Sequence, residues 1–341
     1  MQTFNSTPTV AEEFPTNPRD YGQLILQLII AVVGFYGIII GTAYGPIYTP
    51  LIIFAFTIDL IGLLYNNNYL AAMNWGLLKP NEQAKDPITR HARLIVTVGL
   101  ALLFAAFLGY VYFFIPSNSS FAIFQFVSAP TAFDIGAISL SGTLLLVLLE
   151  VIAPEAEEGF FSASLVPTIT LFFRKGAGIT IVIALVGIAF TAVLKIYLFS
   201  IAFIFLAIIF LFSSKLNLKF EQNKYVPPAL AIFFIGILFA LYHYYAFQSQ
   251  ADIFALFLKA AIFFWTTNTI NFMLKNTIFS RIAHSGNNMI IGISALGATL
   301  AVDINAAIIF TLYIIALLSI YKYGDRFSLT RILRSRMVRV A

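Results

Sequence analysis

Apolar runs of about 20 residues, each closed by a short polar stretch, recur along the whole chain. A helix of that length crosses the roughly 30 Å hydrocarbon layer of a bilayer. The run 178–213 is too long for one crossing and has Lys195 near its centre, so it predicts two short helices with the lysine at the hairpin tip. The stretch 121–173 predicts an interfacial piece followed by one long crossing broken near Pro154. The other predicted spans are 23–43, 47–65, 94–115, 226–247, 252–273, 278–299 and 303–321.

This pattern predicts an all-α polytopic membrane protein with about ten transmembrane helices. One helical domain would cover residues 22–321, between a polar N-terminal tail at 1–21 and a basic tail at 322–341. Composition agrees, because 60% of the residues are hydrophobic and only 10% are charged. In soluble domains about half of the residues are apolar and about a quarter are charged. The chain has no cysteine, which excludes disulfides, thiolate metal sites and cysteine nucleophiles.

The basic residues report orientation rather than nucleic-acid binding, since they lie in short loops and in the C-terminal tail. With ten spans, every basic cluster falls on the same side of the membrane, so both termini are expected in the cytoplasm. In the tail, arginines alternate with apolar residues at helical spacing, which predicts an interfacial helix against anionic lipid. The clusters are 79–93, 174–175, 215–224, the pair Lys275 and Arg281, and 322–339.

The most unusual polar stretch is 150–161, which places four carboxylates in apolar sequence. A carboxylate at membrane depth costs several kcal/mol unless it is neutralised, paired or facing a wet cavity, so such a cluster indicates a functional site. The alternative is a polar turn at the membrane surface, where acids cost little. Glu157 and Glu158 point about 100° apart on one helix, so one can face a cavity while neighbours hold the other.

Two of the three histidines, His243 and His284, lie in apolar sequence. Asn288 follows His284 by four residues, so both project from one helix face. A carboxylate can take a proton from a water that one histidine orients, and a second histidine with an amide can stabilise an oxyanion. Two histidines and a glutamate could also hold zinc. There is no HExxH motif, however, so no cofactor is predicted and zinc is left open.

Three short motifs occur in the order found in the CAAX prenyl protease and bacteriocin-immunity family, which are intramembrane glutamate proteases with the signature EExxxR, FxxxH and HxxxN. Over roughly 140–300 the chain resembles this family, which implies a protease-like core of eight helices and a membrane-embedded or lipid-anchored peptide substrate. The matching residues are Glu157-Glu158, Phe239-x-x-x-His243 and His284-x-x-x-Asn288.

By this resemblance, Glu157 would activate water, His243 would help to bind it, and His284 with Asn288 would stabilise the oxyanion. Glu158 would be the supporting acid. The expected activity is therefore an intramembrane endopeptidase that forms no covalent intermediate.

The chain departs from the family pattern at two places. Ser162 stands where the first motif has its arginine, so whatever orients the glutamates must be replaced or lost. The segment 178–224 makes the distance between the first two motifs longer by about one hairpin, and we interpret it as an insertion. The second motif could instead fall on 190–194, which has no histidine, and the site would then be inactive.

Depth along the helices gives a separate expectation. Ideal helices place Glu157 and His243 at about the same depth, roughly 25 Å from one face, but leave His284 about 10 Å short of them. Asp59 lies near the centre of its span and has no predicted role.

Two other functional classes fit the same residues. A non-catalytic scaffold, immunity protein or complex subunit could keep the fold without the reaction. An ion-coupled transporter also uses broken helices and intramembrane carboxylates, although the hydropathy contains no inverted repeat.

Overall fold

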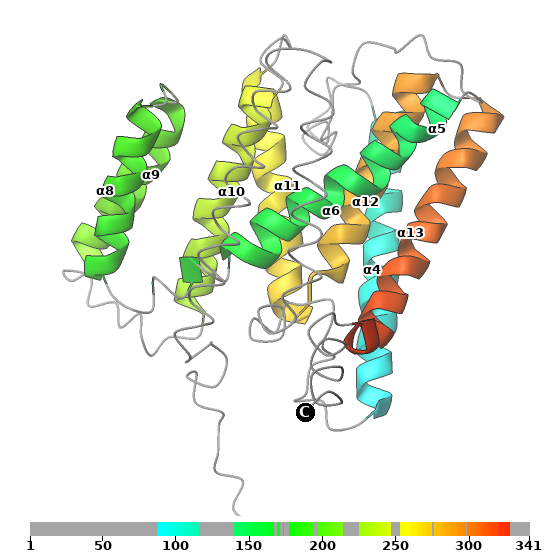
Figure 1. Cartoon of the computed structure of the whole chain (residues 1–341), viewed down its shortest axis with the longest axis horizontal. Coiled ribbons are helices and arrows are strands. Elements are labelled where there is room, and N and C mark those ends of the chain that lie inside the picture. The colour runs from blue at the N-terminus through cyan, green and yellow to red at the C-terminus, as the bar shows by residue number, and fades with distance from the viewer. Residues whose placement is uncertain are drawn as a thin grey trace, which may run out of the picture.

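The computed structural model describes residues 87–115, 140–166, 169–170, 173, 177–193, 195, 197–213, 225–246, 253–274, 276–297 and 299–327, and every element in these ranges is a helix (Figure 1). The predicted spans 23–43 and 47–65, Asp59, and the tails 1–21 and 328–341 lie outside them. The all-α class is therefore confirmed for the described part of the chain, and the count of about ten spans stays a prediction.

The predicted spans of the described part correspond closely to helices. The first is α4 (Pro87–Phe114), and the acids lie on a continuous helical segment made of α5 (Leu140–Val147), η4 (Leu148–Ile152), α6 (Ala153–Glu157) and η5 (Glu158–Leu165). The others are α8 (Ala177–Val193), α9 (Tyr197–Ser213), α10 (Val226–Ala246), α11 (Ile253–Leu274), α12 (Ile278–Leu296) and α13 (Leu300–Phe327).

The lengths and surfaces of these helices are those of a membrane protein. Among the described residues, α4, α10 and α13 are long and apolar enough to cross a bilayer, and α8 and α9 are shorter apolar helices. Large apolar side chains are exposed on α4, α8, α9 and α13, for example Ile95, Val186, Ile204 and Leu312. Contiguous exposed apolar surface is unfavourable in water but matches the acyl chains of a bilayer.

The long apolar run around Lys195 forms a helical hairpin, as its length predicts. Lys195 joins α8 to α9 with a positive φ of 59°, and its N–H donates to the carbonyl of Ala192 (3.0 Å). A hydrogen bond of 2.7 Å between the hydroxyls of Thr191 and Ser200 links the two helices. The hairpin lies at the edge of the molecule beside α10 (Figure 1). Its status as an insertion into a family fold stays a prediction.

The helix that carries the acids is not broken near Pro154, which corrects the expectation from the sequence. The backbone stays helical from Leu140 through Leu165, and Pro154 lies in the first turn of α6. Wide π-helical turns on both sides, η4 and η5, replace a break. Proline is tolerated at the start of a helical segment because its missing N–H is needed least there, and π-turns are often found at functional sites.

Helix α12 is the centre of the described part, with contacts to α4, η4, α11 and α13. Its approach to α4 depends on Gly286, where a Cβ atom would lie 2.6 Å from the Cβ of Ala105. This close packing buries both sides of α12, and its polar residues therefore meet other helices rather than lipid.

Candidate functional site

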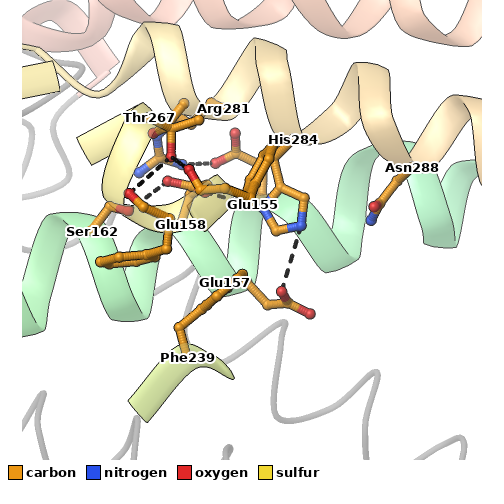
Figure 2. Close-up of polar contacts among 12 residues, drawn as sticks. Glu155, Glu157, Glu158, Ser162, Phe239, Thr267, Arg281, His284 and Asn288 are labelled. Atoms are coloured by element: carbon orange, nitrogen blue, oxygen red, sulfur yellow. Dashed lines mark hydrogen bonds and ion pairs between the residues drawn. The ribbon is translucent and has the colours of Figure 1, made fainter. Parts of the chain in front are cut away.

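Two histidine side chains, from two other helices, approach one carboxylate oxygen of Glu157 on α6. Its Oε2 lies 3.7 Å from Nε2 of His243 on α10. The same oxygen lies 3.5 Å from Nε2 of His284 on α12 (Figure 2). This buried oxygen has no hydrogen-bond partner within the described ranges, while Oε1 accepts a hydrogen bond from the hydroxyl of Tyr242 (3.2 Å). The structure thus brings together Glu157 and both of the histidines singled out in the sequence.

The other ring nitrogen of each histidine is already engaged. Nδ1 of His243 lies 2.9 Å from the carbonyl oxygen of Phe239, and a carbonyl can only accept, so its hydrogen is assigned to Nδ1. Nδ1 of His284 lies 3.0 Å from Oε1 of Glu158. With both Nδ1–H groups donated in this way, the Nε2 atoms are left facing Glu157.

Phe239 has two functions in this arrangement. Its carbonyl orients His243 one helical turn later, and its ring packs 4.3 Å from the ring of His243 and 6.0 Å from that of His284, measured between centroids. The four-residue spacing of the second motif therefore has a physical reason in α10.

Ser162 replaces the motif arginine with a neutral donor. Its hydroxyl donates to Oε2 of Glu158 at 2.6 Å, within the widened helix η5. Glu158 is 1% exposed, and its other oxygen faces His284. The second acid of the pair is thus held by neighbours while the first faces the histidines, which is the division of roles that their angular separation allows.

Arg281 lies in α12 and is buried, so it is not one of the loop residues that the sequence led us to expect. It is 1% exposed and its guanidinium forms an ion pair with Glu155. Its Nε donates to Oγ1 of Thr277 (3.2 Å), and the hydroxyl of Tyr313 on α13 donates to Glu155. A buried arginine is expected to have a paired acid, and the acid cluster supplies one.

The buried entry to α12 explains how His284 reaches the depth of the other two residues. The turn before α12 is itself inside the protein: Ser280 N–H donates to Oδ1 of Asn271 (3.1 Å), whose amide donates to the Ser280 hydroxyl (2.7 Å). The amide oxygen of Asn276 accepts from the N–H of Ile278 (3.1 Å). Because its N-terminus is buried, α12 does not start at the surface. The expected gap of about 10 Å came from the assumption that it does.

Asn288 shares the helix face of His284, one turn further along α12 (Figure 2). Its amide nitrogen donates to the carbonyl of Leu149 at 3.0 Å, in the turn before α6. The adjacent contact comes from Ser285, whose hydroxyl donates to the carbonyl of Glu150. Asn288 is thus directed to the backbone of the acid-bearing helix, and among the contacts of the described residues it has none with Glu157 or with either histidine.

Glu150 is the acid that these contacts do not explain. It is buried, and neither of its carboxylate oxygens has a hydrogen-bond partner in the described part of the chain. Its Oε1 lies over Gly292 of α12, 3.9 Å from where a Cβ atom would be. A buried ionisable group without a partner is costly and is a candidate for function.

The sequence gives no role to Tyr242 or Tyr313, includes Glu155 only as one of the four acids of 150–161, and leads us to expect Arg281 in a basic loop. A polar residue in an apolar run was the available signal for each, but only the folded chain pairs Glu155 with a residue 126 positions away.

No group of three or more histidine, cysteine or acidic side chains in the described ranges is arranged to hold a metal ion. Comparisons of the chain with models of protein families, with curated proteins and with solved structures found no match. The likeness to the CAAX prenyl protease and bacteriocin-immunity family therefore rests on the three short motifs and on no match of the whole chain.

Proposed function

We propose that this membrane protein is an intramembrane endopeptidase that hydrolyses a membrane-proximal peptide bond with a water activated by Glu157. One observation carries the proposal: Nε2 of His243 and Nε2 of His284 lie 3.7 and 3.5 Å, respectively, from Oε2 of Glu157. These distances are too long for good hydrogen bonds between the groups themselves. A water among them could donate to Oε2 of Glu157 and to Nε2 of His243 and accept from Nε2–H of His284, which would satisfy the buried oxygen.

In the proposed reaction, Glu157 removes a proton from this water as the water oxygen attacks the carbonyl carbon of the substrate. In this reaction His284 carries a hydrogen on each ring nitrogen: Nδ1–H donates to Glu158, and Nε2–H donates to the oxyanion. As the C–N bond breaks, the proton held by Glu157 passes to the leaving nitrogen. No covalent intermediate forms.

The resemblance adds Asn288 as a second oxyanion donor. A side-chain amide has two N–H groups, and the contact with Leu149 engages one of them. The other is the group that would bind the oxyanion.

The orientation and partners follow the same proposal. With the basic loops in the cytoplasm, both termini lie there, and the tail 322–341 would lie against anionic lipid. The substrate would be a peptide that is embedded in the membrane or anchored by a lipid, because the acids and histidines lie among apolar helices.

The experiment uses purified protein in liposomes with a library of randomised peptides that carry a C-terminal lipid anchor, and mass spectrometry detects new peptide ends. We expect new ends with the wild-type protein, unchanged by the metal chelator 1,10-phenanthroline, and none with Glu157→Gln. Equal products from both proteins would contradict the proposal, and loss of products with the chelator would move the chemistry to a metal.

One observation favours a second candidate, an ion-coupled carrier: the carboxylate of Glu150 is buried and has no hydrogen-bond partner among the residues that the structure describes. Proton flux into the same liposomes, followed with an entrapped pH dye, tests it. A carrier loses flux when Glu150 becomes glutamine, whereas a protease has no flux to lose.

A further inference from the structure

Pro154 changes the hydrogen bonding of the backbone that precedes it. In an α-helix the N–H of residue 154 would donate to the carbonyl of Glu150, and in a π-helix to that of Leu149. Here the preceding turn is π-helical, with the N–H of Ala153 donating to the carbonyl of Leu148. Proline has no N–H, so whichever of these two carbonyls residue 154 would have bound lacks that donor.

Both carbonyls are instead bound from α12. The hydroxyl of Ser285 donates to the carbonyl of Glu150, and the amide of Asn288 donates to that of Leu149 (3.0 Å). Buried carbonyls without donors are costly, more so in lipid, where water cannot replace the missing donor. The two side chains therefore supply donors to both carbonyls that residue 154 could have bound, as neighbouring helices do for prolines within membranes.

The donors and the proline lie next to the residues of the site. Ser285 follows His284 directly, and Glu157 lies three positions after Pro154. A bond that fixes these two segments to each other also fixes the distance between Oε2 of Glu157 and Nε2 of His284, which is 3.5 Å.

We propose that Pro154, Ser285 and Asn288 form a carbonyl lock, in which the proline removes one backbone donor and the two side chains bind the two carbonyls that this donor could have reached, so that α12 is held in register with the acid-bearing helix. Ser285 and Pro154 are then positioning residues, and Asn288 has a positioning role in addition to any contact with the oxyanion. The lock is a structural claim; its effect on catalysis rests on the proposed function.

A double-mutant cycle tests the lock, with the unfolding midpoint of the purified protein in detergent as the readout. Ser285→Ala and Asn288→Ala are each measured with Pro154 and with Pro154→Ala, which restores the N–H. We expect each single variant to lower the midpoint by about 2–4 °C. For at least one of them the loss should fall by half or more beside Pro154→Ala, because the new N–H supplies the missing donor.

Ser162→Ala is the matched control, since the Ser162 hydroxyl binds Glu158 and not a carbonyl that an N–H at residue 154 could reach. Its loss should be the same in both backgrounds. If the losses at Ser285 and Asn288 are also unchanged by Pro154→Ala, the lock is refuted. Pro154→Leu restores the same N–H and replaces the alanine variant if that variant does not accumulate.

Catalysis gives the readout that separates positioning from general stability. Ser285→Ala should lower kcat about tenfold on a lipid-anchored peptide with little change in KM, and Ser285→Thr, which keeps the hydroxyl, should restore it. A rise in KM alone, or no rescue by threonine, would contradict a positioning role. If the unfolding cycle shows the coupling but no variant or wild type cleaves any peptide, the lock stands and the proposed function fails.

Discussion

Arg281→Met is expected to destabilise the protein by about 3–5 kcal/mol, the largest effect on stability that we expect at any single side chain. The substitution keeps the volume but leaves Glu155 buried without its cation, and removing one partner of a buried ion pair costs far more than the pair itself contributes. Glu155 also accepts from Tyr313, which does not neutralise the charge. The unfolding free energy in detergent measures the effect.

The matched control removes both charges. In the double variant Glu155→Gln with Arg281→Met, most of the lost stability should return, because no unpaired charge is left inside the protein. Tyr313→Phe should cost only about 1 kcal/mol, the usual contribution of one hydrogen bond. If the double variant is as unstable as Arg281→Met, burial of an unpaired charge is not the cause.

Glu157→Gln has the largest expected effect on activity, a loss of about 10²–10⁴-fold in kcat/KM. Glutamine has the same shape and its amide oxygen can still accept from Tyr242, which is 3.2 Å from Oε1 of Glu157. It cannot take a proton from water, however. Cleavage of a lipid-anchored peptide in liposomes gives the rate, and the unfolding midpoint should stay close to that of the wild type.

Tyr242→Phe is the control for this prediction. It removes the hydrogen bond to Oε1 but leaves the carboxylate and its ability to take a proton. The rate should fall by about tenfold at most, in line with one lost hydrogen bond. A glutamine variant that cleaves as fast as Tyr242→Phe would rule out Glu157 as the base.

The sequence predicts the helices of the described part well because each depends on a local property, an apolar run of membrane length. The position of Lys195 between α8 and α9 follows in the same way. The break expected at Pro154 is absent, and the reason lies outside the apolar segment that contains the proline. Donors from α12 bind the carbonyls of Leu149 and Glu150, the two that an N–H at residue 154 could reach, and the helix continues.

The residues of the site also divide into those that the sequence indicates and those that it does not. The motifs select Glu157, His243 and His284, which the structure brings together. The residues that support them depend on pairings across the chain, such as Arg281 with Glu155, that no spacing indicates. The depth estimate for His284 failed because it assumed that α12 begins at the surface, whereas Asn276 and Ser280 are buried.

The measurement that tests the central claim most directly compares the cleavage rates of His243→Ala, His284→Ala and the double variant. If Glu157 and the two histidines hold one water, the first substitution already removes most of its function, and residues that act as a unit are strongly non-additive. We therefore predict that the loss in the double variant is close to the larger of the two single losses. Single losses that multiply in the double variant would contradict a shared water.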